Sequence, residues 1–209
     1  MDGLLIDSEP LWKIAAEDLF NTYGKQLTAA QYAQTTGLRT KEFLECWFTH
    51  FRLPAEKINE AESIIVKQVI DLVKQNGKPM PGIEYIFNFF ISRNFKIGLA
   101  SSSPGSLIEV VVDLLGIRNY LQAVSTAENL KYGKPHPEVY LNCAEKLGAY
   151  PNECICFEDS YNGMIAAKAA KMKCVIVPSS TQLKNKTWEA ADCKITTLSN
   201  FNELLLSSL

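Results

Sequence analysis

Between residues 81 and 177 the sequence alternates short apolar runs with longer amphipathic stretches. Four runs have the length and composition of buried β-strands, at 96–100, 123–125, 154–157 and 174–177. Three stretches between them show the helical spacing of apolar residues, at 107–115, 137–147 and 163–170. This alternation is typical of a parallel sheet with helices on both faces. The pattern therefore predicts a doubly wound α/β core.

Residues 14–78 contain no strand-like run and have a helical pattern instead. Apolar residues recur three or four positions apart, first from Leu44 to Phe51 and then from Ile64 to Val73. Asn76-Gly-Lys-Pro79 provides a helix stop at the end of this region. We predict an all-helical segment inserted into the α/β core, with the core formed by 1–13 and 80–209 and the insert by 14–79.

Composition and charge exclude several classes of protein. The chain has 209 residues, of which 47% are hydrophobic, enough to bury a large core. Its net charge of -2 provides no basic stripe for a nucleic acid or an anionic membrane. Acidic residues follow Met1 where a secretory signal would be basic, so we expect a cytoplasmic protein. We also expect a monomer whose six cysteines, which lack CxxC spacing, are reduced core residues.

Four short polar segments lie where loops should leave strands, which is where open α/β sheets bind ligands. They are Met-Asp-Gly-Leu-Leu-Ile-Asp at 1–7, Leu-Ala-Ser-Ser-Ser at 99–103, Gly-Lys-Pro-His-Pro at 133–137 and Phe-Glu-Asp-Ser-Tyr-Asn-Gly at 157–163. Taken one at a time, each segment is explained as a turn, a helix cap or a solvated charge. Their order and separations together indicate a single site.

In this order the four segments resemble the motifs of haloacid dehalogenase-like phosphatases that carry a helical cap. Those motifs are D-x-D-G, a strand ending in Ser or Thr, a Lys in a loop, and an E-D or D-D pair. The resemblance runs essentially from end to end of the chain and implies a Rossmann-like core with an inserted helical cap. It also implies a phosphomonoester hydrolase for a small phosphorylated metabolite, namely a sugar or sugar-alcohol phosphate.

The resemblance places Met1 at the variable position of D-x-D-G, so the first Asp of the motif would precede Met1. In the family that Asp attacks phosphorus and forms an aspartyl phosphate, which water then hydrolyses. The apolar strand that leads into it would also be missing, and we expect the chain as it stands to be inactive. We expect a start assigned too far downstream, against the alternatives of a deliberately shortened chain and a natural product without catalysis.

Asp2 is the second Asp of the motif, which the resemblance makes the general acid and then the general base. Ser101 and Lys134 would act on the transferring phosphoryl group, and the amides of Ser102 and Ser103 would donate hydrogen bonds to its oxygens. These groups would stabilise the negative charge that the equatorial oxygens carry during phosphoryl transfer.

The same resemblance predicts a magnesium site and contacts to the substrate. Mg²⁺ would be held by Asp159, Glu158, the missing carboxylate and the backbone carbonyl of Asp2. Arg39 in the cap is the candidate for contacting the substrate. Asn162 is placed with the phosphate-binding residues, where it would orient the loop. For Trp12 and Trp47 we expect core packing, against the alternative that they line the pocket.

Two other functions remain open on the sequence. A phosphoglucomutase of similar architecture would return the phosphate to a sugar instead of to water. A binding module would hold a phosphorylated ligand through the same side chains without turning it over. A purely structural role has little support. Its expected sign is a large exposed apolar face, and a single sequence cannot show whether such a face exists.

Overall fold

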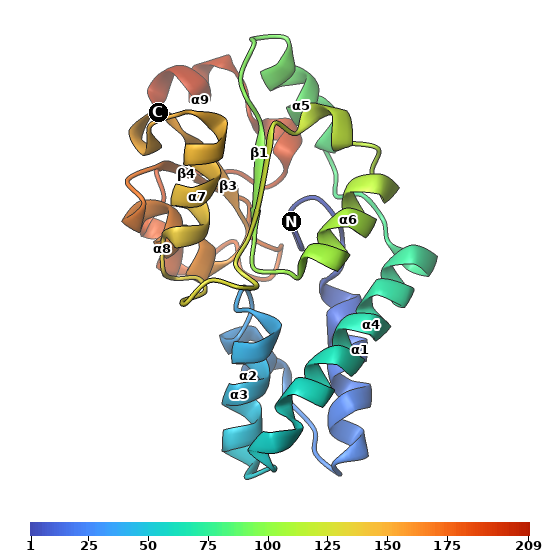
Figure 1. The fold of residues 1–209 in the computed structure, drawn as a ribbon. Helices are drawn as coiled ribbons and strands as arrows, with labels where there is room; N and C mark the ends of the chain where they lie inside the picture. The colour runs from blue at the N-terminus through green and yellow to red at the C-terminus, as the bar shows by residue number, and fades with distance from the viewer.

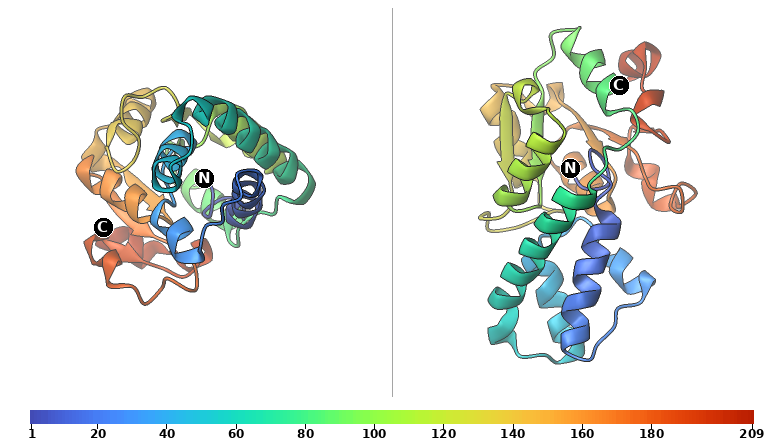
Figure 2. Two further views of the ribbon diagram at one scale, coloured as in Figure 1. Left: turned by 90° about the horizontal axis from the view of Figure 1, so that it is seen from below. Right: turned by 90° about the vertical axis from the view of Figure 1, so that its right-hand side faces the viewer.

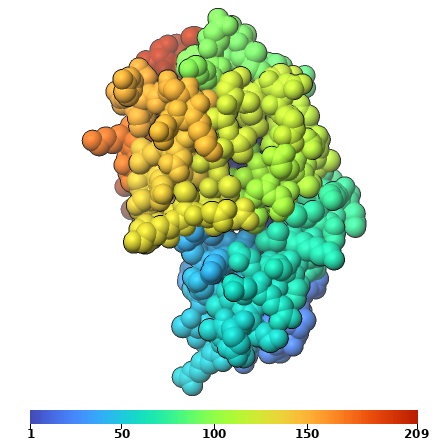
Figure 3. Space-filling view, in the orientation of Figure 1, coloured from blue at the N-terminus to red at the C-terminus, as the bar shows by residue number.

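The computed structural model describes residues 1–209 as two lobes joined by a narrow waist (Figures 1 and 3). The lower lobe is built from four helices, α1 (Glu9–Thr22), α2 (Ala29–Gln34), α3 (Thr40–Phe51) and α4 (Ile58–Asn76), with a short 3-10 turn at Ala55–Lys57. Helix α4 packs on both α1 and α3, and Figure 2 shows α1 and α4 running side by side. It ends at Asn76, where the sequence predicts a helix stop.

Aromatic packing holds the lower lobe together. The fully buried ring of Phe20 on α1 contacts Phe43, Phe48 and Phe51 of α3, with ring centroids 5.8–6.1 Å apart. Burying a side chain of this size stabilises a fold by about 1.5–3 kcal/mol. The apolar positions at helical spacing therefore form the interior of this lobe.

The upper lobe contains the α/β core. Its strands are β1 (Gly98–Ser101), β2 (Ala123–Thr126), β3 (Ile155–Glu158), β4 (Lys173–Ile176) and β5 (Cys193–Lys194). Its helices are α5 (Ile83–Ile91), α6 (Gly105–Leu114), α7 (Glu138–Leu147), α8 (Tyr161–Ala169) and α9 (Glu203–Ser208), with 3-10 turns at Arg118–Tyr120, Pro151–Glu153, Lys186–Ala190 and Leu198–Asn200. Every pairing between the strands is parallel. The predicted α/β fold is thus confirmed, with element boundaries that differ by one or two residues.

Two smaller expectations differ from the structure. Strand β5 is too short to produce a periodic pattern, and the sequence did not predict it. All six cysteines are free, but Cys46 lies exposed on α3 instead of in the core. The remaining five are buried or half-buried. None of the helices combines the length and the apolar character needed to cross a bilayer.

The sheet is divided between β1 and β3. Strand β1 pairs only with β2, while β3 pairs with β4, and β4 with β5. A cavity of about 590 Å³, lined mainly by apolar side chains, is bordered by β1 residues such as Leu99 and by β3 residues such as Phe157. Each of these two strands therefore keeps a backbone edge without a ladder partner. We call this cavity the strand slot.

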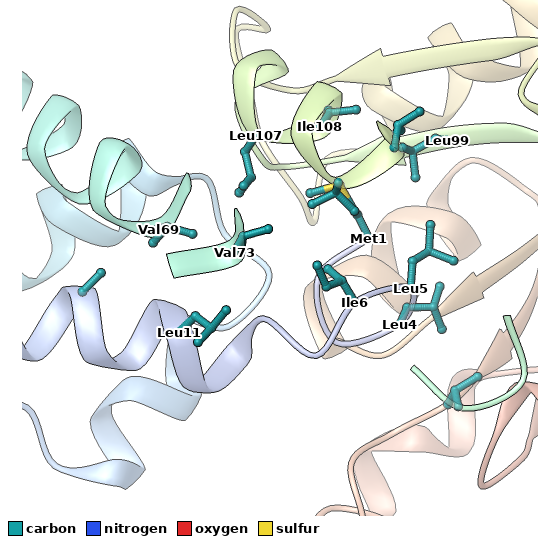
Figure 4. Packing of buried hydrophobic residues seen from close by; sticks show 14 of the residues in the cluster. Met1, Leu4, Leu5, Ile6, Leu11, Val69, Val73, Leu99, Leu107 and Ile108 are labelled. Atoms are coloured by element: carbon teal, nitrogen blue, oxygen red, sulfur yellow. The ribbon is translucent and has the colours of Figure 1, made fainter. Parts of the chain in front are cut away.

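The first residues of the chain connect the slot to both lobes. Met1, Leu5 and Ile6 are buried near Leu99 of β1 and Leu107 of α6 (Figure 4). The backbone turns sharply here, with the amide of Leu5 donating to the carbonyl oxygen of Met1 at 2.7 Å. The backbone amide of residue 7 then donates a hydrogen bond to the segment 78–80. This turn places residue 2 at the carboxyl ends of β1 and β3.

An apolar strand attached ahead of Met1 is expected to fill the slot. Met1 lines both the slot and the cavity at the strands' carboxyl ends, so a segment leading into it would run parallel to β1 and β3. Three buried aliphatic side chains would contribute about 5 kcal/mol, which raises the melting temperature by roughly 10 °C or more. Thermal unfolding would measure the gain.

The control is an extension of equal length made of Gly and Ser, which supplies backbone but no apolar side chains. We expect it to change the melting temperature by less than about 3 °C. Equal effects of the two extensions would show that the slot does not accept an apolar strand.

Candidate active site

A cavity enclosing about 90 Å³ lies at the carboxyl ends of β1 and β3, where the two lobes meet. The upper lobe and the first turn contribute most of the residues predicted from the motifs, namely Asp2, Ser101, Ser102, Ser103, Lys134, Glu158 and Asp159. The lower lobe contributes residues that the motifs did not indicate, including Glu9, Trp12, Tyr32, Thr35 and Thr36. The fold therefore brings together segments separated by more than a hundred positions.

Three donors fix the carboxylate of Asp2. Its Oδ1 accepts from the hydroxyl of Ser8 at 2.6 Å and from the indole N–H of Trp12 at 2.9 Å. Its Oδ2 accepts from the hydroxyl of Ser103 at 2.5 Å. Trp12 packs against the core, as expected, but its indole also lines the cavity and orients Asp2. Trp47, in contrast, is buried and donates to the hydroxyl of Thr35.

Lys134 and Glu158 form a buried ion pair. The ammonium Nζ lies 2.5 Å from Oε1 of Glu158, and both side chains are about 5% exposed. The hydroxyl of Tyr140 also donates to Oε1, and that of Ser160 to Oε2 at 3.1 Å. Burial disfavours both charges, but their attraction outweighs it, so the pKa of Glu158 is lowered and that of Lys134 is raised. Tyr140 lies in the first turn of α7, and the four motifs did not indicate its contact with Glu158.

The strand end at Ser101 is held by internal hydrogen bonds. The amide of Ser103 donates to the hydroxyl oxygen of Ser101 at 3.1 Å. The hydroxyl of Ser102 donates across the waist to the carbonyl oxygen of Gly37 at 2.9 Å. The three serines are thus at the cavity wall as predicted, but the amide of Ser103 and all three hydroxyls already have partners within the protein.

Asp159 differs from Glu158, because its carboxylate accepts no hydrogen bond from the protein. It packs against Gly3, where an added Cβ would lie 2.2 Å from Oδ2 of Asp159. Gly3 has a φ of +67°, so both the turn and the close approach favour glycine. Burial, followed by the charge of Glu158, raises the pKa of Asp159 to about 7. The aspartate of the pair therefore keeps its oxygens free.

Glu9 adds another carboxylate to the cavity. It lies at the start of α1, and its side chain has no hydrogen bond or ion pair. Burial, followed by the charges of Asp159 and Asp2, raises the pKa of Glu9 to about 8. Lys134 is the single basic side chain that lines the cavity. Four carboxylates thus face the ammonium of Lys134 and the N-terminal ammonium of Met1, which leaves an excess of negative charge.

This excess suits a cation with hard oxygen ligands, and Asp159 supplies free carboxylate oxygens for one. Glu158 fits the role less well, because both of its oxygens accept hydrogen bonds. No group of three or more acidic, His or Cys side chains is close enough to hold a metal ion alone. The donors present fit part of a magnesium site, and the remaining ligands would come from backbone, water, substrate or the family's additional carboxylate.

Two predicted substrate-binding residues lie outside the cavity wall. The guanidinium of Arg39 donates to the carbonyl oxygens of Ala127 and Leu130, at 3.3 and 2.6 Å. Asn162 donates its side-chain amide to the carbonyl oxygen of Thr36 at 3.1 Å. Both side chains therefore bridge the two lobes.

Replacing Glu9 by Gln is expected to stabilise the protein at alkaline pH. The Glu9 pKa rises from 4.5 to about 8 on folding. The contribution of Glu9 to the free energy of unfolding is therefore greatest below pH 4.5 and falls as the pH rises toward 8. Gln has no charge to bury, so we expect a melting temperature at least about 3 °C above wild type at pH 8.5 and little difference at pH 5. Thermal unfolding with a chelator present would measure both.

Glu56→Gln, an exposed position on the same lobe, serves as the control and should leave the pH profile unchanged. A Glu9→Gln variant whose melting temperature differs from wild type equally at both pH values would contradict the buried carboxyl.

Comparison with known proteins supports the resemblance found in the motifs. The sequence profile of the haloacid dehalogenase-like hydrolases matches residues 1–177. Hexitol phosphatase B of Escherichia coli strain K12 is 36% identical over 199 residues, which cover 95% of this chain and 90% of that protein. Fructose-1-phosphate phosphatase YqaB of the same strain is 29% identical, covering 85% and 93%.

Solved structures show the same fold. A β-phosphoglucomutase from Clostridium difficile superimposes with a TM-score of 0.85 at 24% identity, covering 99% of this chain and 92% of that one. CbbY from Rhodobacter sphaeroides, solved with phosphate, gives a TM-score of 0.82 at 21% identity, covering 96% and 92%. On the profile match and the identity to these relatives, the chain belongs to the haloacid dehalogenase-like hydrolase family.

Proposed function

We propose that this protein is a magnesium-dependent phosphatase for a sugar or sugar-alcohol phosphate. The observation that carries the proposal is the cavity at the waist, where Lys134, the serines after β1 and the carboxylates of Asp2 and Asp159 meet. The names of two relatives, a hexitol phosphatase and a fructose-1-phosphate phosphatase, support the substrate class. We expect the protein to act in the cytoplasm as a monomer.

Different residues of the chain would perform different parts of phosphoryl transfer. Lys134 offers a fixed positive charge to the phosphoryl oxygens, and Ser101 offers a hydroxyl at the end of β1. Asp2, held by three donors, would protonate the leaving sugar oxygen and then take a proton from the attacking water. Lys134 donates to Glu158 and to the hydroxyl of Tyr140, which leaves one of its N–H donors for a ligand.

Asp159 and the backbone carbonyl of Asp2 would hold Mg²⁺, assisted by Glu158 as the sequence predicts. When bound, the ion would offset the repulsion between the carboxylates and a phosphate dianion. The choice of magnesium follows from the oxygen donors, which suit a hard divalent cation.

The predicted cap, residues 14–79, would cover this cavity. It contributes Tyr32, Thr35 and Thr36 to the cavity wall. Closing a cap excludes water and assembles the site around the substrate. A polar wall on the cap side suits a leaving group rich in hydroxyls.

The position of the nucleophile decides whether these 209 residues turn over substrate. The family's attacking Asp aligns with the position before Met1, so we expect the chain alone to bind phosphate without releasing it from a substrate. A form extended upstream by an apolar strand and this Asp should release phosphate from hexitol phosphates when magnesium is present. The measurement is inorganic phosphate release from a panel of sugar and polyol phosphates.

Chelation of magnesium should abolish activity of the extended form, and an extension ending in Asn should match the unextended chain. Equal turnover by the chain with and without the extension would overturn this assignment of the nucleophile.

A mutase is the second candidate, since solved structures with this fold include β-phosphoglucomutases. The same assay separates the two, because a mutase forms a sugar bisphosphate and releases little inorganic phosphate. A third outcome, tight binding without turnover by the extended form, would identify a binding module.

Lys134→Met in the extended form should lower both activity and stability. Removing one partner of a buried ion pair leaves an uncompensated charge and costs about 3–5 kcal/mol, which lowers the melting temperature by roughly 10 °C. Loss of the charge facing the phosphoryl group should reduce kcat by about 100-fold or more. Adding Glu158→Gln should restore much of the stability and none of the activity. Recovery of activity in the double variant would contradict a role for Lys134 in the reaction.

A further inference from the structure

The cap segment Thr36–Arg39 touches all three core loops that carry the site. Thr36 accepts from Asn162 in the first turn of α8, just beyond the loop after β3, and Gly37 accepts from Ser102 in the loop after β1. Arg39 reaches the loop after β2. In Figure 3 this loop, in yellow, lies along the waist directly above the cap.

The third of these contacts is the most extensive. Arg39 Nη1 donates to the carbonyl oxygen of Leu130 at 2.6 Å, and its Nη2 donates to Oε1 of Glu42 at 2.6 Å. The same oxygen of Glu42 accepts from the backbone amide of Gly133 at 3.2 Å. Glu42 also accepts from the amide of Arg39, at the start of α3. We call Arg39 and Glu42, with these contacts, the clasp.

The clasp contacts both ends of the loop 127–133. At its first residue, the amide of Ala127 donates to the carbonyl oxygen of Ser101, and its own carbonyl accepts from Arg39. At its last residue, Gly133 packs so closely that an added Cβ would lie 2.5 Å from Oε2 of Glu42 and 2.8 Å from Nε of Arg39. The residue that follows is Lys134.

The clasp lies at the back of the loop and does not line the cavity. Arg39 is about 16% exposed and Glu42 about 26%. Their charges are directed at each other and at backbone groups, and Nε of Arg39 is buried without a hydrogen-bond partner. Neither side chain is directed at a group that a phosphorylated ligand in the cavity would present.

We propose that Arg39 and Glu42 are positioning residues that couple the cap to the placement of Lys134. They hold the loop before Lys134 only while the cap contacts the core, so the phosphate-binding ammonium is correctly placed only in the closed arrangement. This inference rests on the proposed function, because it assigns Lys134 to the phosphoryl group. It differs from the sequence-based expectation that Arg39 binds the substrate directly.

The test combines a structural and a binding measurement on the 209-residue chain. Hydrogen exchange of the Gly133 amide, followed by NMR, reports whether the clasp is formed. Calorimetric titration with inorganic phosphate in the presence of Mg²⁺ reports whether Lys134 is placed. The variants are Arg39→Ala, Glu42→Ala and the double variant, with Glu42→Gln as the conservative change that keeps an acceptor for Gly133.

We expect each single Ala variant to speed exchange at Gly133 and to weaken phosphate binding about tenfold. The double variant should lose no more than either single variant, because both remove the same clasp. Glu42→Gln should recover part of the loss. The matched control is Glu45→Gln, an exposed glutamate on the same helix, which should leave both measurements unchanged.

Direct binding of the ligand by Arg39 would give a different result. Arg39→Ala would weaken phosphate binding while Glu42→Ala left it unchanged, and this would overturn the proposal. Unchanged exchange at Gly133 in both variants would also overturn it. If wild type binds no phosphate, the proposed function fails, whereas the exchange data still decide whether the clasp forms.

Discussion

Lys134 and Glu158 form an ion pair at the bottom of the cavity, and the arrangement of the site depends on it. Two charges are removed from water there, which is unfavourable unless each finds its partner and further hydrogen bonds. Tyr140 and Ser160 provide those bonds. Because Lys134 comes from the loop after β2 and Glu158 ends β3, the pair holds two loops in a fixed relation. The core thus supplies the ion pair, while the cap residues Arg39 and Glu42 contact the loop that leads into Lys134.

Negative charge dominates the rest of the cavity. Asp2, Glu9 and Asp159 lie near Glu158, and burial together with mutual repulsion raises the pKa of Glu9 and of Asp159. Such a cluster is costly unless protons or a cation neutralise it. A divalent ion would serve that purpose and would allow a phosphate dianion to approach. The raised pKa values and the proposed need for a divalent cation thus both follow from the crowding of buried carboxylates.

The cap joins the core in two ways, through an apolar cluster in which α4 packs on α6 and through hydrogen bonds made by the segment 36–39. Thr36, Gly37 and Arg39 each contribute one or more hydrogen bonds to a different core loop. Hydrogen bonds of this kind have modest net free energies, because water competes for the same groups. The side of the waist formed by residues 36–39 is therefore held more weakly than the apolar side at α4 and α6.

The sequence by itself determined the elements and the membership of the site. Strand and helix patterns depend on neighbouring residues, so periodicity located β1 to β4 and the helices α6, α7 and α8 that alternate with them. The ends of parallel strands meet at one edge of a sheet, so motif order was enough to bring Asp2, Ser101, Lys134 and Asp159 together. Only the tertiary structure decided which groups those side chains contact. Trp12 donates to Asp2, Tyr140 supports Glu158, and Arg39 is directed at backbone carbonyls, because each contact joins elements whose distance and orientation no local pattern encodes.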